Sequence, residues 1–268
     1  MTKTVLITGG TGELGKALVP RLLAAGYKVC IGSRRAAPTE LPDGVSWAQM
    51  DLATGEGVAK ANIADIIIHA ASSPFRNTDA TDVEGAKRLL EVAKEPEYFL
   101  YISIVGVDKI PYRYYRYKVA TEEVVAQGQV PWGILRATQF HSLLDMGLAA
   151  QRKWPFFLVP KGYNFQPIAT KEVADVMVTA VIERQLGHLP DLAGPESRPA
   201  TELAQMWQAS QGLNKPIWQL PMLTKAARAF QAGHHTLPER PFGTITWQDW
   251  LAAKYGIARG QKYEATKP

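Results

Sequence analysis

The stretch of sequence that decides the fold is TVLITGGTGELGKAL, residues 4–18. A β-branched, apolar run at 4–8 ends in glycines, and leucines then recur at helical spacing. Gly9, Gly12 and Gly15 permit a tight turn, a close approach of the backbone to a ligand, and close packing of a helix on a strand. Backbone N–H groups at the start of such a helix favour anions. The stretch therefore predicts a strand, a phosphate-binding turn and a helix, the first unit of a dinucleotide-binding domain.

The same alternation continues along the first half of the chain. Further strands are expected at 27–33, 45–50, 63–69, 98–103 and 130–135. Amphipathic helices are expected between them, at 114–126 and on the face formed by Val83, Ala86, Lys87, Leu90 and Ala93. The apolar residues 66–68 are typical of a central parallel strand, which is buried on both faces. This pattern predicts the α/β class, with a Rossmann-type doubly wound parallel sheet and right-handed crossovers.

The alternation of strand and helix stops beyond Ala137. A helix at 170–184 is expected to pack back on the sheet, while Pro, Trp and Phe gather at 154–167 and 216–250. We therefore divide the chain into a dinucleotide-binding domain, 1–165, and a smaller, mostly helical substrate-binding region, 185–268, which we expect to fold onto the carboxyl edge of the sheet. Only the tail at 261–268 is expected to be disordered.

The composition is that of an ordinary globular protein. The 268 residues are 46% hydrophobic and 21% charged, which suffices for one sizeable core with a smaller appendage. The single cysteine, Cys30, excludes an intramolecular disulfide framework, and its neighbours predict a buried thiol. No apolar stretch approaches the ~18–20 residues that a membrane-spanning helix needs. We expect a cytoplasmic protein with no membrane partner, either a monomer or a dimer.

The net charge and the histidines bear on two other kinds of ligand, nucleic acid and metal ions. The net charge of +5 comes from dispersed basic residues, and the absence of a contiguous basic stripe argues against a nucleic-acid partner. His141 is expected either to line a substrate pocket or to lie on the surface at a helix start. His234 and His235 have no acidic neighbours at metal-ligand spacing, so we expect them to be solvated and predict no metal site.

The end of the second strand indicates which dinucleotide is bound. Ser33, Arg34 and Arg35 stand where an NAD-preferring site usually carries an acidic residue. Two guanidinium groups suit a 2′-phosphate, so we expect NADP(H) in preference to NAD(H); the alternative is a solvated pair of surface arginines. At the end of the third strand, Asp51 is placed to accept from the adenine amino group, with Leu52 over the ring. Asp51 could instead be a helix N-cap.

Three polar residues predict acid–base chemistry. Tyr114 and Lys118 are separated by four positions on one expected helix, so the phenol and the ammonium share a face. A nearby cation lowers the pKa of a phenol, which lets Tyr114 exchange a proton with a carbonyl or an alcohol. Ser103, at the end of the preceding strand, could hydrogen-bond the same substrate oxygen. Tyr115 is the alternative phenol.

Together these residues resemble a known family. The turn at 8–15, the Arg34-Arg35 pair, the strand ends at 69–72 and 103–108, the Tyr114/Lys118 pair and the segment 135–141 look like an atypical short-chain dehydrogenase/reductase of the NmrA-like, NAD(P)H-binding group. The resemblance implies contacts from the protein to each part of the cofactor. The pyrophosphate would be met by Gly9, Thr11, Gly12 and Leu14, the 2′-phosphate by Arg34 and Arg35, and the nicotinamide side by Ala70, Ala71, Ser72, Lys118, Ala137, Thr138 and Gln139.

The resemblance supports the cofactor more firmly than the reaction, because members of this group differ in function. We expect an NADPH-dependent oxidoreductase that passes hydride to a small, apolar carbonyl or quinone-like acceptor, with Tyr114 as proton donor. The alternative is a non-catalytic, NAD(P)H-binding redox sensor that contacts a protein partner. Epimerisation of a nucleotide sugar ranks lower, because the C-terminal region carries no sign of a sugar-nucleotide pocket. The segment Ala70-Ala71-Ser72-Ser73 departs from the asparagine-rich segment common in the wider superfamily, which argues against the usual proton relay.

Overall fold

The computed structural model describes residues 2–74, 77–93 and 96–256, so the tail expected to be disordered lies outside the described residues. The chain forms two compact units. The sheet unit comprises 1–108, 112–137 and 170–191; the C-terminal unit comprises 109–111, 138–169 and 192–268. Our boundary at residue 165 differs from this division, because residues 138–165 group with the C-terminal unit. In the part of the chain that is described, no helix combines the length and the apolarity needed to cross a membrane.

The sheet unit is built on seven strands whose neighbours all pair in parallel. In spatial order they are β3 (Val45–Gln49), β2 (Lys28–Ser33), β1 (Thr4–Thr8), β4 (Ile66–His69), β5 (Tyr98–Ile104), β6 (Trp132–Ala137) and β9 (Gly187–His188). After β1 the chain adds β2 and β3 on one side of it, and then crosses to add β4 on the other side of β1. Ligands of open α/β sheets bind at the carboxyl ends of the strands beside such a reversal. Thr8 is paired with Gly32 and His69, so three strand ends meet at this point.

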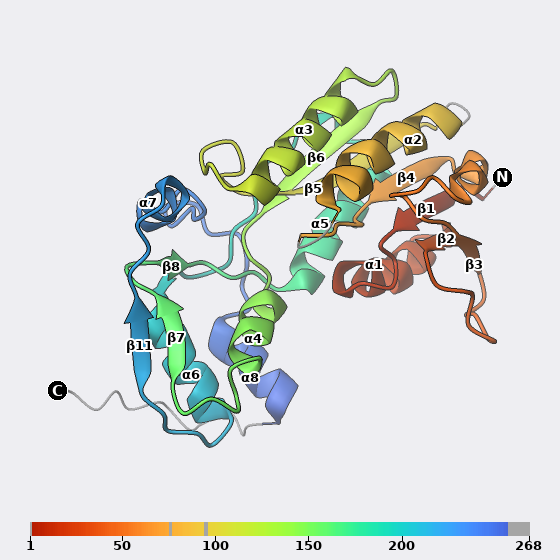
Figure 1. The fold of residues 1–268 in the computed structure, drawn as a ribbon. Coiled ribbons are helices and arrows are strands. Elements are labelled where there is room, and N and C mark those ends of the chain that lie inside the picture. The colour runs from red at the N-terminus through yellow and green to blue at the C-terminus, as the bar shows by residue number, and fades with distance from the viewer. Residues whose placement is uncertain (1, 75–76, 94–95, 257–268) are drawn as a thin grey trace. The chain divides into compact units, whose positions relative to one another are not determined.

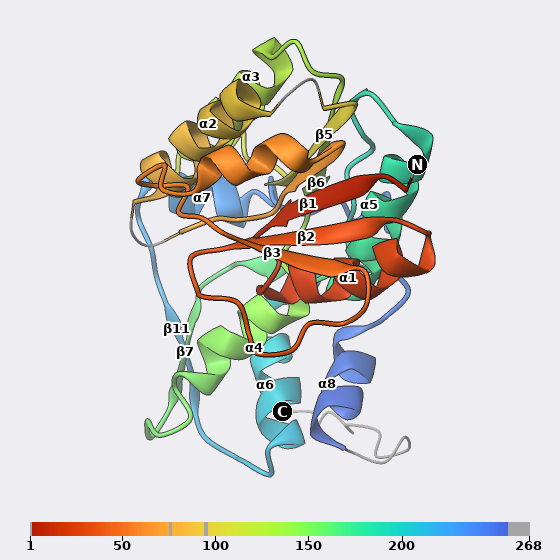
Figure 2. The same ribbon diagram turned by 90° about the vertical axis from the view of Figure 1, so that its right-hand side faces the viewer.

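Helices cover both faces of this sheet, as Figures 1 and 2 show. The helical elements of the sheet unit are α1 (Glu13–Ala24), the 3-10 helix η1 (Val58–Ile63), the π-helix η2 (Asp79–Val83), α2 (Glu84–Val92), α3 (Arg113–Gln127) and α5 (Thr170–Glu183). α2 and α3 lie on one face, and α1 and α5 on the other. α5 is fastened to α1 by an ion pair between Arg21 and Asp175, 2.6 Å, and by a hydrogen bond from Thr170 to Glu13. The doubly wound Rossmann-type fold is confirmed.

The core of the sheet unit follows the apolar strand pattern. The side chains at 66–68 of β4 and at 5–7 of the neighbouring β1 are all completely buried. Full burial of one such aliphatic side chain stabilises the fold by about 1.5–3 kcal/mol. Cys30 is 1% exposed, and burial raises the pKa of its thiol. The buried thiol predicted for Cys30 is confirmed.

Three details of the sheet unit differ from the sequence-based expectation. Ile63 ends η1 instead of starting a strand, and β9 was not predicted. The expected core face of α2 is confirmed for Val83 and Ala86, which are buried, and for Leu90 and Ala93, which pack against the core. Lys87 is exposed, and Leu89 is the fully buried residue instead. Asp82, just before α2, is completely buried as well. The position expected for Lys87 was wrong because its ammonium is solvated and pairs with Glu84 at the surface.

The C-terminal unit is mainly helical, with two pairs of short strands. Its elements are α4 (His141–Ala149), β7 (Phe157–Pro160), β8 (Asn164–Phe165), β10 (Arg198–Pro199), α6 (Ala200–Ser210), β11 (Ile217–Leu220), α7 (Lys225–Gln231) and α8 (Trp247–Tyr255). β7 pairs with β11 in parallel, and β8 with β10 antiparallel. Trp207 and Trp247 anchor its core at 1% exposure. Asp145 accepts hydrogen bonds from Trp207, Lys254 and Tyr255, which ties α4, α6 and α8 together.

Two histidines of the C-terminal unit are buried, contrary to the surface positions considered for them. His141 stacks on Trp247 and Trp250, with ring centroids 5.7 Å apart in each pair. His235 packs against Phe230, 4.9 Å between centroids, whereas the adjacent His234 is exposed. Burial lowers the pKa of both buried imidazoles to about 4. The prediction that His235 is solvated was wrong, because a neutral imidazole packs well among aromatic rings once tertiary contacts form.

Candidate functional site

The glycine turn after β1 lies directly against the loop that follows β4. Gly9 has a φ of +72°, and a Cβ placed on it would lie 2.8 Å from the nitrogen of Ala71 and 2.9 Å from the carbonyl of Ala70. A Cβ on Gly15 would lie 2.4 Å from the Cα of Gly10. A side chain at either position would push the backbone apart. The two glycines therefore allow the turn, the loop and α1 to approach one another closely.

The first turn of α1 is open to a ligand. Its N-cap is Gly12, which supplies no side-chain hydrogen bond to the helix. A Cβ on Gly12 would contact only the carbonyl oxygen of Gly9, so the space beside the helix start is clear. Leu14 is buried, so its side chain packs in the core and only its backbone is left for a phosphate. Uncapped N–H groups at the positive end of a helix suit a diphosphate, and this arrangement fits the pyrophosphate of a dinucleotide.

The end of β2 presents one of the two arginines to a hollow. A hollow of about 220 Å³ is lined by Arg34, Asp51, Gly57 and Lys60, among others. Arg34 and Arg35 are both exposed. Arg35 contributes backbone contacts: its N–H donates to Ser33, and its carbonyl accepts from the indole of Trp47. The lining of the hollow thus contains two basic residues, Arg34 and Lys60, and two acidic residues, Asp51 and Glu56.

Asp51 and Leu52 take more local roles than those expected. The Oδ1 of Asp51 accepts from the N–H of Ala53 at 2.8 Å, which closes a turn and leaves Oδ2 for another donor. No helix starts there, so the N-cap alternative does not apply. The Leu52 side chain is 6% exposed and lies where a Cβ on Gly85 would clash. Its side chain is therefore packed in the core, and an adenine ring would meet mainly its backbone.

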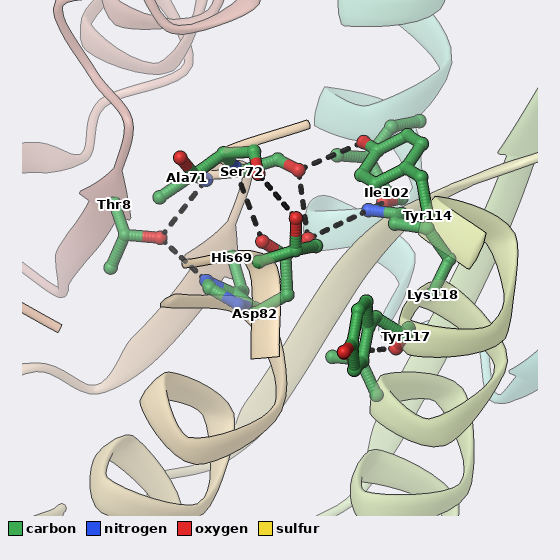
Figure 3. Close-up of polar contacts among 12 residues, drawn as sticks. Thr8, His69, Ala71, Ser72, Asp82, Ile102, Tyr114, Tyr117 and Lys118 are labelled. Atoms are coloured by element: carbon green, nitrogen blue, oxygen red, sulfur yellow. Dashed lines mark hydrogen bonds and ion pairs between the residues drawn. The ribbon is translucent and has the colours of Figure 1, made fainter. Parts of the chain in front are cut away.

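The loop after β4 connects the glycine turn with Tyr114. The N–H of Ala71 donates to Thr8 Oγ1 at 3.4 Å, and Thr8 Oγ1 lies 2.8 Å from Nδ1 of His69. The next residue, Ser72, lies 2.8 Å from the phenol oxygen of Tyr114 (Figure 3). Ala71 and Ser72 are adjacent in the chain, so one short loop contacts both the expected phosphate site and the expected acid.

Behind Ser72 lies a buried carboxylate. Ser72 donates its hydroxyl to Oδ1 of Asp82 at 2.8 Å, and the N–H of Ser73 donates to Oδ2 at 3.3 Å. The ammonium of Lys118 is 3.7 Å from Oδ1. The side chains of Asp82 and Lys118 are 0% and 4% exposed. Figure 3 shows the resulting chain of polar groups, which runs from Asp82 through Ser72 to Tyr114.

The contacts of Lys118 explain its position beneath the site. Its Nζ donates to the carbonyl of Ile102 at 2.9 Å and lies 4.3 Å from the ring centre of Tyr101. Burial lowers the pKa of this ammonium and raises the pKa of the Asp82 carboxyl. The opposite charge of each group is the largest influence that opposes the effect of burial on the other.

The phenol of Tyr114 is a weaker acid than the sequence suggested. Burial raises its pKa to about 12, and the negative charge of Asp82 adds to the rise. We expected Lys118 to lower this pKa, and that expectation was wrong for this structure. The physical reason is that the ammonium is paired with Asp82.

The other proposed catalytic groups lie on β5 and α3. Ser103 is 3% exposed, and among the described residues its Oγ has no hydrogen-bond partner. It lies two positions after Tyr101 in β5, and side chains at i and i+2 share one face of a strand. Tyr115, the alternative phenol, is 6% exposed and packs edge-on against Tyr112. Of the two tyrosines, Tyr114 is the one that contacts the polar chain.

The three residues expected near the nicotinamide ring fall in different units. Ala137 ends β6 in the sheet unit, whereas Thr138 and Gln139 belong to the C-terminal unit. Thr138 donates to the carbonyl of Gln166 at 2.6 Å, within that unit. Gln139 is 9% exposed, and its side-chain amide has no hydrogen-bond partner among the described residues.

Asp82 was not among the predicted site residues. A signal was present, because Asp82, Ala86 and Leu89 follow the i, i+4, i+7 spacing of one helix face, and a carboxylate on a buried face needs a partner. The π-helix η2 that carries Asp82 is a second signal, since π-turns are frequent at functional sites. That signal could be read only from the structure.

The fold and the glycine turn define a dinucleotide-binding Rossmann protein, and comparison with known proteins specifies the family. A family model described as NAD(P)H-binding matches residues 9–184. The chain belongs to this NAD(P)H-binding family.

Curated relatives are distant. An uncharacterised protein of Mycobacterium tuberculosis is 25% identical over 197 residues, which cover 71% of this chain and 22% of that protein. The chain therefore spans about a fifth of the length of this relative. The photosystem II assembly factor Ycf39 of Cyanophora paradoxa is 23% identical over 238 residues, covering 82% of this chain and 72% of that protein.

Solved structures establish the likeness of the fold. The UDP-glucose 4-epimerase of Thermus thermophilus, in complex with NAD, superposes with a TM-score of 0.72 at 17% identity and covers 97% of this chain and 100% of its own. A short-chain dehydrogenase/reductase superfamily protein of Agrobacterium tumefaciens with bound NAD gives a TM-score of 0.71 at 16% identity, covering 94% and 96%. At this identity the likeness speaks for the fold and not for the reaction.

Proposed function

We propose that this protein is an NADPH-dependent oxidoreductase that reduces a small carbonyl or quinone-like acceptor. The observation that carries the proposal is the loop Ala70-Ala71-Ser72, which abuts Gly9 of the phosphate-binding turn and hydrogen-bonds Tyr114 through Ser72. This loop links a cofactor-binding turn to a proton-bearing phenol in one unit of the protein. A protein that only binds a dinucleotide has no need for such a phenol.

The residues of the sheet unit account for binding. The amides of the turn around Gly12 hold the diphosphate, and Arg34, with Lys60 beside it, receives the 2′-phosphate and sets the preference for NADP(H). Asp51 offers its free carboxylate oxygen to the adenine amino group. When bound, the nicotinamide supplies hydride. The cofactor is a dinucleotide of the NAD(P)H class by family, and its phosphorylated form is our proposal.

Side chains of α3 and β5 account for the chemistry. Tyr114 donates the proton that the substrate oxygen needs as it becomes an alcohol. The hydroxyl of Ser103, which has no hydrogen-bond partner in the described part of the chain, orients that oxygen and stabilises the charge that develops on it. Lys118 keeps its charge buried next to Asp82 and so keeps the base of the site electrically compensated. We propose a small, apolar substrate.

The test is turnover with a matched pair of variants. NADPH oxidation, followed by absorbance, is measured against a panel of quinones and aldehydes with the wild type, Tyr114→Phe and Tyr112→Phe. Loss of general acid catalysis costs typically 10²–10⁴-fold, so we expect Tyr114→Phe to lose about a hundredfold or more of kcat. Tyr112 lies just before α3 and is exposed, so its variant should keep full activity. Equal activity of all three proteins would refute the proposed role of Tyr114.

The alternative is a redox sensor that binds the dinucleotide without turnover. The observation in its favour is the raised pKa of Tyr114, about 12, which makes the phenol a reluctant acid. Tight, saturable binding of NADPH without consumption on any member of the panel would favour the sensor.

A further inference from the structure

The polar chain of Figure 3 has a direction, because each hydroxyl carries a single proton. Ser72 lies 2.8 Å from Asp82 on one side and 2.8 Å from Tyr114 on the other. An ionised carboxylate can only accept, so the proton of Ser72 is directed to Asp82. The oxygen of Ser72 then offers a lone pair to Tyr114, and the phenol is the donor in that contact.

We propose that Asp82 is a positioning residue which holds the hydroxyl proton of Ser72, so that Tyr114 is kept in its proton-bearing form until a substrate oxygen takes the proton. The proposal rests on the proposed function of Tyr114 as the acid. It assigns a role to a residue that contacts neither substrate nor cofactor and acts only through Ser72.

The surroundings of Asp82 support its ionised form. It accepts from the N–H of Ser73 and from the hydroxyl of Ser72, and the ammonium of Lys118 lies 3.7 Å away. Two hydrogen-bond donors and one cation converge on this buried carboxylate. They stabilise its charged form against the burial that raises its pKa. A protonated carboxyl would instead need an acceptor.

The other titratable groups near the chain are neutral or paired with each other. Burial lowers the pKa of His69 on β4 to about 3 and raises that of Tyr101 on β5 well above its ordinary value, so both are neutral at pH 7. On α3, Glu122 acts on Lys118 and is itself bound by Arg136. Tyr112, at the start of α3, acts on Tyr114 as a further phenol. The carboxylate of Asp82 is therefore the negative charge that acts on Tyr114 through Ser72.

The proposal predicts opposite signs for the two directions of the hydrogen bond between Ser72 and Tyr114. If Ser72 accepts from the phenol, removal of its hydroxyl takes an acceptor from the protonated form and lowers the midpoint of tyrosinate formation. If Ser72 donates, removal takes a donor from the phenolate and raises the midpoint. Ser72→Ala distinguishes the two cases and leaves the pair of Asp82 and Lys118 in place.

The readout is the titration of one tyrosine. A ring-fluorinated tyrosine at position 114 has a more acidic phenol, which brings its titration into the range where the protein stays folded, and fluorine NMR reports on that residue alone. We expect Ser72→Ala to lower the midpoint by about half a pH unit, the effect of one hydrogen bond. Asp82→Asn should lower it by about one pH unit, because a charge within hydrogen-bonded reach is removed and an amide can donate to Ser72.

Asp79→Asn is the matched control. Asp79 belongs to the same π-helix and is exposed, so its variant should leave the midpoint in place. If Asp82→Asn does not fold, because Lys118 loses its partner, the sign of the shift in Ser72→Ala decides alone. A midpoint that rises or stays unchanged in Ser72→Ala would overturn the proposal. The titration needs no turnover, so its failure is distinguishable from failure of the proposed oxidoreductase activity in the acceptor panel.

Discussion

Gly9 and Gly26 both adopt a left-handed backbone conformation. Comparing an alanine substitution at each position therefore separates the effect of close packing in the glycine turn from the effect of conformation. Gly9 has a φ of +72° and Gly26 a φ of +84°, both in the left-handed region. An L side chain there costs about 1–2 kcal/mol. A Cβ on Gly26 would have no atom within 4 Å, whereas a Cβ on Gly9 would lie 2.8–2.9 Å from the backbone of Ala70 and Ala71. Only Gly9→Ala must therefore displace a neighbouring segment.

The size of the extra cost follows from the contacts that such a displacement loosens. The N–H of Ala70 donates to the carbonyl of Thr8 at 3.2 Å, and that of Ala71 to Thr8 Oγ1 at 3.4 Å. A hydrogen bond contributes about 0.5–1.5 kcal/mol. We expect Gly9→Ala to lower the free energy of unfolding by about 1–3 kcal/mol more than Gly26→Ala does, from the loss of two such bonds.

The assay pairs urea denaturation with NADPH binding followed by fluorescence. Gly26→Ala should bind NADPH as the wild type does, because Gly26 follows the C-terminal end of α1, at the opposite end of the helix from the phosphate turn. Gly9→Ala should bind at least about tenfold more weakly, the effect of 1.4 kcal/mol. Equal losses of stability in the two variants, or undiminished affinity in Gly9→Ala, would refute the close approach of the turn to the loop as the reason for glycine at this position.

Three further predictions follow from single residues. Arg34→Ala should weaken NADPH binding by about tenfold or more and leave NADH binding unchanged. Arg35→Ala should have a smaller effect, because of the two arginines only Arg34 lines the hollow. Titration calorimetry with both cofactors checks this, and equal effects on the two cofactors would contradict it. Burial gives His235 a folded-state pKa of about 4, below its unfolded value. Its titration therefore leaves the free energy of unfolding unaffected above pH 6.5 and lowers it by about 1.4 kcal/mol for each unit by which the pH falls from 6.5 to 4. Urea midpoints measured across this range should fall less steeply in His235→Phe than in the wild type, and parallel curves would show that His235 is protonated in the fold. Cys30, 1% exposed with a raised pKa, should react with an aromatic disulfide reagent only after denaturant is added, and rapid reaction of the native protein would show that the β2 core opens.

Local pattern was sufficient for most of the sheet unit. The strand at Thr4–Thr8, the glycine turn and the helix after it were all readable from spacing, because each depends on residues next to one another in the chain. The short strand β9, Gly187–His188, was not readable, since its pairing with β6 supplies its order. The same holds for the assignment of 138–165 to the C-terminal unit, which depends on long-range packing.

The candidate site also divides into features set by local sequence and features set by long-range packing. Tyr114 and Lys118 were found because they share one helix, whereas Ser72 was implied by the family resemblance. Asp82 was not found, since its partners come from α3 and from the loop after β4. The predicted effect of Lys118 on the phenol was wrong for the same reason, because Asp82 binds the ammonium.

The sequence by itself determined the class of fold, the phosphate-binding turn and the set of polar residues at the carboxyl edge, because apolar periodicity and glycine conformations are local properties of the chain. The tertiary structure alone decided which charges meet: Asp82 with Lys118, and Ser72 between Asp82 and Tyr114. Proton affinity depends on burial and on the nearest charges in space, and neither is fixed until distant segments have packed together.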